Sequence, residues 1–127
     1  MNMEKVLFAF FILLALTLNF GFFIGDMTDP DQHHSYELFA ALVVSLIATV
    51  MKFGDRTAMG SVLLAASLVA DLQLLAAALV WGIVVYGMQL QMSTGVIASI
   101  VSMSGGALLA NLVSVVLLIM ETFVARR

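Results

Sequence analysis

The chain has 127 residues, of which 63% are hydrophobic and only 10% are charged, and its formal net charge is −3. A soluble domain contains about 45–50% apolar and about 25% charged residues, so this composition excludes a soluble globular protein and indicates an integral membrane protein. The absence of cysteine excludes disulfides and thiolate metal sites, and no cluster of basic residues points to nucleic acid.

Residues 6–24 form the first apolar segment and predict a retained membrane-spanning helix. A signal peptide is the alternative, but its apolar part is usually only about 7–15 residues long, and no small-residue cleavage site follows here. Gly21 and Gly25 form a GxxxG pattern, which allows a second helix to approach closely.

The segment after the first helix carries half of the chain's eight acidic residues, namely Asp26, Asp29, Asp31 and Glu37. The order Asp29-Pro30 followed by Gln32 is typical of a helix start, because the aspartate caps free N–H groups and proline suits the first turn. A second helix is therefore predicted over residues 30–53. On it Asp29, His33 and Glu37 share one face. Together with Asp26 and Asp31 they predict either a cation-binding outer mouth or a solvated rim, with the metal left open.

A short connection follows, in which Gly54 is the expected end of the second helix and Asp55 the expected cap of the third. The third helix is predicted over residues 57–86. Asp71 lies near its middle and therefore near the bilayer midplane, where a carboxylate costs on the order of 2.5–3.5 kcal/mol. No basic residue lies at that depth within the chain, so protonation, a bound cation or water is favoured. Asp71 is the centre of the functional hypothesis, and Ser67 shares its side of the helix. The alternative is a neutral Asp71 that is hydrogen-bonded to a neighbouring helix and holds the bundle together.

The fourth helix is predicted over residues 94–124 and carries a small and polar stripe. Ser104, Ala107, Asn111 and Ser114 recur on one face, with two glycines beside Ser104. One interpretation is a packing seam between helices, and the other is the wall of a polar path that faces Asp71. Ser45 and Thr49 form a weaker stripe of the same kind on the second helix.

The basic residues predict the topology. Lys5, Lys52, Arg56, Arg126 and Arg127 all fall at the two termini or in the second connection. With four spans, the positive-inside rule places both termini in the cytoplasm. The sequence thus predicts a multi-pass protein of the cell inner membrane, and a single transmembrane domain over residues 1–127.

The stretches FGDRTAMG (residues 53–60) and SLVADLQLLAAALVWG (residues 67–82) resemble an uncharacterised family of small four-span bacterial inner-membrane proteins. The resemblance extends over most of the chain and implies no activity.

The predicted fold is an all-α, four-helix membrane bundle that forms a symmetric homo-oligomer, because so small a bundle can hardly enclose a path unaided. The leading functional hypothesis is a cation channel or an ion-coupled transporter with its ion pathway at Asp71, Ser67, Ser104 and Asn111. The alternative is a non-conducting structural or accessory subunit of a larger membrane complex. An enzyme is not expected, nor any cofactor beyond a bound cation. The expected partners are lipid, further copies of the chain and inorganic cations. The ion, the number of subunits and the gating stimulus stay open.

Overall fold

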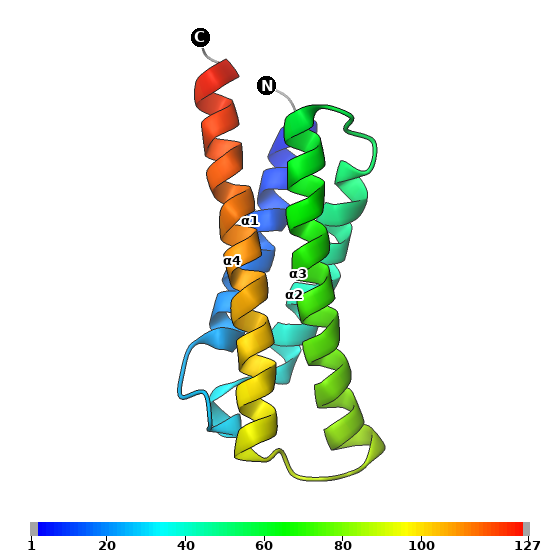
Figure 1. The fold of residues 1–127 in the computed structure, drawn as a ribbon, viewed down its shortest axis with the longest axis vertical. Helices are drawn as coiled ribbons and strands as arrows, with labels where there is room; N and C mark the ends of the chain where they lie inside the picture. Colours follow the sequence, from blue (N-terminus) through cyan, green and yellow to red (C-terminus); the bar gives the residue numbers. More distant parts are fainter. Residues whose placement is uncertain (1–2, 126–127) are drawn as a thin grey trace.

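A computed structural model describes residues 3–125, which form four long helices joined by short connections (Figure 1). The helices are α1 (Met3–Phe23), α2 (Ser35–Lys52), α3 (Ala58–Gly82) and α4 (Thr94–Ala125). A 3-10 turn, η1 (Pro30–Gln32), precedes α2, and a π-helical turn, η2 (Ile83–Gly87), extends α3. Arg126 and Arg127, which contribute to the predicted topology, lie outside the described residues.

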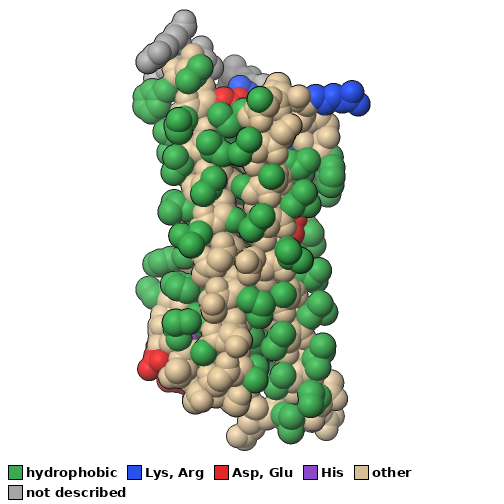
Figure 2. All heavy atoms as spheres, in the orientation of Figure 1, with side chains coloured by type: hydrophobic (Ala, Val, Ile, Leu, Met, Phe, Trp, Pro, Cys, Tyr) green, Lys and Arg blue, Asp and Glu red, His purple; other side chains and the backbone are tan. Residues whose placement is uncertain are grey.

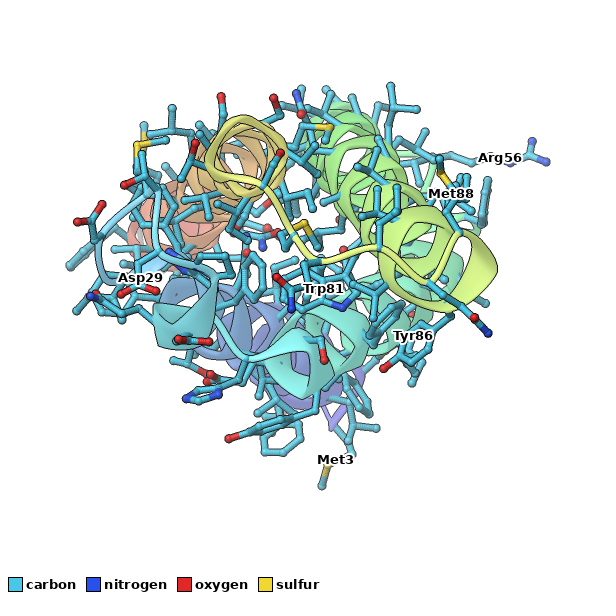
Figure 3. All side chains as sticks on the ribbon, turned by 90° about the horizontal axis from the view of Figure 1, so that it is seen from below. Met3, Asp29, Arg56, Trp81, Tyr86 and Met88 are labelled. Carbon is cyan, nitrogen blue, oxygen red and sulfur yellow. The ribbon has the colours of Figure 1, made fainter. Side chains whose placement is uncertain are left out.

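The four helices run alternately up and down, and each packs mainly against its two neighbours in chain order, with α4 closing on α1. Figure 3 shows this ring of helices along the bundle axis. Both termini and the α2–α3 connection lie at one end, called here the terminal end (Figure 1). The α1–α2 and α3–α4 connections lie at the opposite end, called the loop end.

The outside of the bundle is apolar along its length, and Figure 2 shows charged side chains mainly at the two ends. Each of α1, α2, α3 with η2, and α4 is long and apolar enough to cross a membrane. Most side chains in each of these segments face outward. In the most apolar 18-residue stretch of each segment, only 22–33% of the residues are buried. A water-soluble bundle would expose polar side chains instead, so the all-helical fold fits a multi-pass membrane protein.

α1 begins three residues before its predicted start and α3 passes into η2 at residue 83, but the largest difference from the prediction is at the start of α2. Asp29 caps a turn as expected, since its side chain accepts a hydrogen bond from the Asp31 N–H. That turn is η1, however, and it ends at Gln32, so that α2 begins only at Ser35. The prediction of a helix from residue 30 is therefore wrong by five residues. A 3-10 turn and an α-helix use the same capping chemistry in their first turn, so the pattern does not distinguish them.

The cap of α3 also differs from the prediction. Thr57 is the N-cap, and its hydroxyl accepts a hydrogen bond from the Gly60 N–H at 2.9 Å. Asp55 instead positions Thr57, because its carboxylate accepts hydrogen bonds from both the hydroxyl and the N–H of Thr57. These bonds hold the pKa of the Asp55 carboxyl below its ordinary value of 3.8.

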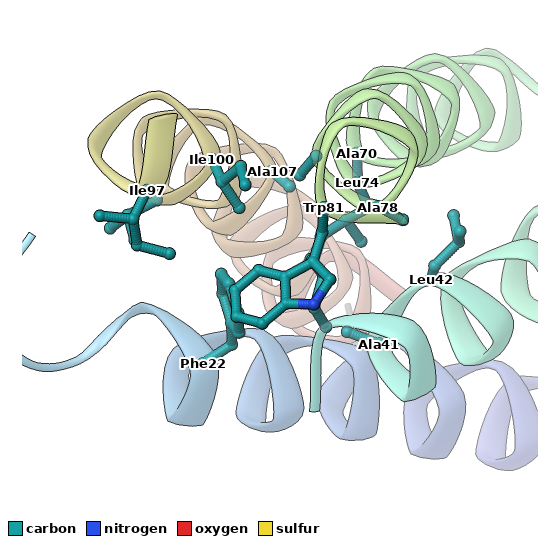
Figure 4. Packing of buried hydrophobic residues seen from close by; sticks show 13 residues of the cluster. Phe22, Ala41, Leu42, Ala70, Leu74, Ala78, Trp81, Ile97, Ile100 and Ala107 are labelled. Atoms are coloured by element: carbon teal, nitrogen blue, oxygen red, sulfur yellow. The ribbon is translucent and has the colours of Figure 1, made fainter. Parts of the chain in front are cut away.

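The apolar core is divided into two clusters. The larger lies toward the loop end, where Trp81 packs edge-on against Phe22 at 6.0 Å between ring centroids (Figures 3 and 4). Trp81 is 9% exposed and lies inside the bundle. The smaller cluster lies toward the terminal end and consists of Phe8, Ile12, Ala48 and Leu63.

Between the two clusters, every helix presents a small or polar side chain to the interior. These residues are Ala15 on α1, Ser45 on α2, Ser67 on α3 and Asn111 on α4, and all four are fully buried. This central polar layer places three hydrogen-bonding side chains in the middle of the bundle, and Asp71 lies on the next turn of α3 after Ser67.

Glycines on α4 admit side chains from both neighbouring helices. A Cβ atom at Gly105 would lie 2.9 Å from the ring of Phe23, and one at Gly106 would lie 3.1 Å from the amide of Gln73. The two glycines beside the small and polar stripe therefore allow α4 to pack closely against α1 and α3.

Candidate functional site

Asp71 is 7% exposed and contacts α2 through both of its carboxylate oxygens. The Ser45 hydroxyl lies 2.6 Å from Oδ1, and the Thr49 hydroxyl lies 2.5 Å from Oδ2. Ser45 and Thr49 stand one helical turn apart, so both hydroxyls reach the same carboxyl group. The weaker polar stripe of the sequence is thus the direct partner of Asp71.

The Thr49 hydroxyl has a second contact, because its oxygen also lies 2.9 Å from the carbonyl oxygen of Ser45. A hydroxyl carries one hydrogen and can accept further hydrogen bonds, whereas a carbonyl oxygen only accepts. When Asp71 is ionised, Thr49 donates to Oδ2. When Asp71 is protonated on Oδ2, that proton can be donated to Thr49, which then donates to the Ser45 carbonyl. The same heavy-atom positions therefore satisfy both protonation states.

The small exposed fraction of Asp71 opens into a groove on the outer face of the bundle, between α2 and α3. The groove has a volume of about 410 Å³ and, apart from Asp71 and Thr49, its lining is apolar. Leu46, Leu72 and Leu75 contribute to that lining. Asp71 therefore lies at the boundary between the polar layer and the membrane-facing surface.

Ser104 does not face Asp71, and its partner is Asn19 of α1. The Asn19 side-chain amide donates to the Ser104 carbonyl at 2.9 Å, and the Ser104 hydroxyl donates to the Asn19 side-chain oxygen. Both residues are fully buried, and their polar atoms satisfy each other. Ser104 therefore joins α1 to α4 on the loop-end side of the polar layer.

Three further buried polar side chains have no hydrogen-bond partner within residues 3–125. They are Ser67 on α3, and Asn111 and Ser114 on α4, and all three are fully buried. Ser67 lies six residues before Gln73, and Asn111 lies five residues after Gly106, which contacts Gln73. Because the helices are antiparallel, Ser67 and Asn111 lie at the same depth to within about 2 Å.

The acidic connection at the loop end is folded upon itself. Asp26 accepts hydrogen bonds from the N–H and the hydroxyl of Thr28, and these bonds hold the pKa of Asp26 below its ordinary value of 3.8. The Asp29 carboxylate accepts from Asp31 N–H and from the Gln32 amide. Gly25, with φ of 120°, provides the backbone turn into this segment.

His33 points inward and is only 2% exposed. Its Nδ1 lies 2.5 Å from the Phe22 carbonyl oxygen, and its Nε2 lies 2.8 Å from the Asp26 carbonyl oxygen. Because both partners are acceptors, both contacts are hydrogen bonds only in the doubly protonated ring. His33 thereby ties the end of α1 to the loop that follows it.

The predicted shared face of Asp29, His33 and Glu37 does not form. His33 precedes α2 and faces α1, while Glu37 lies in the first turn of α2 with its carboxylate against Gly21. Across residues 3–125, no group of three histidine, aspartate or glutamate side chains has the geometry of a metal site. The GxxxG pattern of the sequence does not act as one helix-packing motif. Gly21 makes room for the Glu37 side chain, and Gly25 lies in the turn after the end of α1.

The sequence identified Asp71 but not which helix supplies its partners. It also did not assign a role to Asn19. The available signals were the i,i+4 spacing of Ser45 and Thr49, and the depth of Asn19 within an otherwise apolar segment. Neither signal gives the rotation of one helix relative to the next, and that rotation decides which polar side chains meet.

A family described as a family of unknown function, DUF6394, matches residues 32–122. This range contains Asp71, its partners on α2 and the buried polar residues of α4, as well as both stretches that resemble an uncharacterised family. The chain belongs to this family, which confirms the expectation of an uncharacterised family. No curated protein and no solved structure matches the chain.

Proposed function

We propose that this member of a family of unknown function is an ion-coupled membrane transport protein in which Asp71 binds and releases a proton. The observation that carries the proposal is the hydrogen-bond network of Asp71, Ser45 and Thr49, which is complete in both protonation states. Proton uptake converts the carboxylate to the neutral acid by forming one O–H bond on Oδ2, and release reverses that step.

The network fits a proton better than a metal cation. A cation such as Ca²⁺ lies about 2.3–2.6 Å from each of six to eight oxygens, which must be spread around it. Here the two hydroxyl oxygens lie directly against the carboxylate, at 2.5 and 2.6 Å. A metal ion would have to separate them, whereas a proton occupies one of the existing contacts.

The position of Asp71 supports a functional role as well. An ionisable side chain at the depth of the hydrocarbon core is costly, and such residues commonly mark ion or proton pathways. The acidic side chains of the loop end, among them Asp26, Asp31 and Glu37, would raise the local concentration of cations at that mouth. The transporter acts in the inner membrane with both termini in the cytoplasm.

The proposal includes a homo-oligomer. Within residues 3–125 the interior is filled by the two apolar clusters and the polar layer, and Trp81 occupies the centre of the loop end (Figure 3). One bundle therefore offers no wide aqueous pore of its own, and symmetric copies would provide the wider pathway.

The test is ion flux into liposomes that contain the purified protein, with separate measurements for H⁺, Na⁺, K⁺ and Ca²⁺. Wild type is compared with Asp71→Asn, and with Gln73→Leu as a control at the same depth on another side of α3. We expect a proton flux that Asp71→Asn abolishes and Gln73→Leu retains. Absence of flux for every ion, or a flux unaffected by Asp71→Asn, would contradict the proposal.

A second candidate function is a non-conducting subunit of a larger membrane complex. The observation in its favour is that both oxygens of Asp71 are already paired with α2, so the carboxyl also serves as a link between helices. In that case neither wild type nor Asp71→Asn would conduct ions. Disruptive substitutions at Ser45 or Thr49 would instead cause the larger complex to be lost from the membrane.

A further inference from the structure

Within residues 3–125, the buried side-chain atoms without a hydrogen-bond partner all lie on one side of Asp71. Ser67 is one helical turn from Asp71 toward the terminal end, Asn111 lies at the depth of Ser67, and Ser114 lies about one turn farther in the same direction. Four buried atoms in these side chains lack a protein partner in the described part of the chain. A buried polar atom without any partner is destabilising, and in folded proteins buried water commonly supplies the missing hydrogen bonds.

The opposite side of Asp71 has no such atoms among residues 3–125. Toward the loop end the interior is formed by the larger apolar cluster, including Leu74, Trp81 and Ile100. Its buried polar pair, Asn19 and Ser104, is mutually satisfied. Water therefore has hydrogen-bonding sites on the terminal side of Asp71 but none of this kind on the loop side.

A pocket opens at the terminal end of the bundle, beyond the smaller apolar cluster. It has a volume of about 290 Å³ and is lined partly by charged side chains, among them Lys52 and Glu121. Leu118 in its wall lies one turn of α4 from Ser114. Phe8 belongs to the smaller apolar cluster and lines the pocket, with the Lys52 ammonium 4.3 Å above its ring centroid.

We propose that Ser67, Asn111 and Ser114 form a buried water site that connects Asp71 to the pocket at the terminal end. Protons reach Asp71 from that end by crossing the smaller apolar cluster, whose Phe8 lines the pocket, while the larger apolar cluster closes the loop end in this conformation. This inference rests on the proposed function for its meaning in transport, because it names the side from which the transported proton arrives. The existence of the water site itself does not depend on transport.

The test follows hydrogen–deuterium exchange of the Asp71 carboxyl group by infrared spectroscopy of the protein in lipid bilayers, at a pH at which that group is protonated. The Asp71 band is identified as the carboxyl signal that Asp71→Asn removes. In wild type we expect the band to shift promptly when the buffer is changed to D₂O. Asn111→Leu, which fills the water site with an apolar side chain, is expected to slow the shift by about tenfold or more.

Asn19→Leu is the matched control, because it replaces another fully buried asparagine on the loop side of Asp71. We expect it to leave the exchange rate unchanged. Ser114→Ala provides a milder change at the water site and is expected to slow exchange while retaining the fold. The fold of each variant is checked through the fluorescence of Trp81, which is the chain's single tryptophan.

A wild-type carboxyl that does not exchange would overturn the inference, and so would unchanged exchange in folded Asn111→Leu and Ser114→Ala. Slower exchange in Asn19→Leu than in Asn111→Leu would also overturn it, because water would then arrive from the loop end. Exchange as predicted, together with an absence of ion flux in liposomes, would retain the water site and refute the transport function.

Discussion

Replacement of Asp71 by asparagine gives a prediction whose size follows from the network at α2. The asparagine oxygen can take the place of Oδ1 and accept from Ser45, and its amide nitrogen can take the place of Oδ2. The amide then donates to Thr49, which donates to the Ser45 carbonyl. Asparagine thus reproduces the hydrogen bonds of the protonated acid, while it can neither bind nor release the proton.

Interhelical hydrogen bonds in membrane proteins contribute about 0.6 kcal/mol each on average and about 1.7 kcal/mol at most. Because Asp71→Asn retains both of them, we expect the free energy of unfolding to change by less than about 0.5 kcal/mol. Asp71→Leu removes both and is expected to lower the free energy of unfolding by about 1–2 kcal/mol.

The measurement is unfolding by a denaturing detergent in mixed micelles, followed through Trp81, which is buried against Phe22 in the larger apolar cluster. An equal loss of stability in Asp71→Asn and Asp71→Leu would refute the reasoning, because the network would then require the ionised carboxylate. A loss in neither variant would show that the contacts with α2 contribute nothing to the fold.

Three further predictions concern residues at the two ends of the bundle. His33→Phe should lower the free energy of unfolding by about 1–3 kcal/mol, because the carbonyl oxygens of Phe22 and Asp26 lose their contacts with the ring nitrogens, whereas the exposed His34→Phe should change it by less than about 0.5 kcal/mol. Equal effects of the two variants in thermal unfolding would contradict the conclusion that the buried His33 ring stabilises the loop end. Gly25→Ala should destabilise by about 1–3 kcal/mol, because a φ of 120° is strained for any residue with a Cβ, whereas Gly82→Ala has open space and should stabilise by up to about 1 kcal/mol. The same sign for both alanines in thermal unfolding would contradict this difference. Since the pKa of Asp55 is lowered in the folded protein, its stabilisation is present above its ordinary pKa of 3.8 and lost as the pH falls below it. Thermal unfolding as a function of pH should therefore show a smaller loss on acidification in Asp55→Asn, and an identical acid profile would contradict this.

The fold follows from the sequence because its determinants are local. Four apolar segments of sufficient length, separated by polar connections, fix the number of spans and nearly all of their bounds. The turn at Pro30 was predicted by its caps but assigned to the wrong kind of helix, because those caps serve both kinds.

The site was predictable only in part. Asp71 is evident from its charge and depth, both of which are properties of one segment. Its pairing with Ser45 and Thr49, and the pairing of Ser104 with Asn19, depend on how helices are rotated and shifted against one another. Those quantities are set by the packing of many side chains, such as Phe23 over Gly105, and no single stretch of sequence encodes them.

The most direct test of the account is whether Asp71 changes its protonation state in the membrane. An infrared difference spectrum between acidic and alkaline buffer, recorded on the protein in lipid bilayers, reports carboxyl groups that gain and lose a proton. The account predicts a protonated-carboxyl band that appears on acidification in wild type and is absent in Asp71→Asn, with the fold of both proteins retained. Identical difference spectra for the two proteins would contradict the account, because Asp71 would then hold one protonation state and serve only as a link between helices.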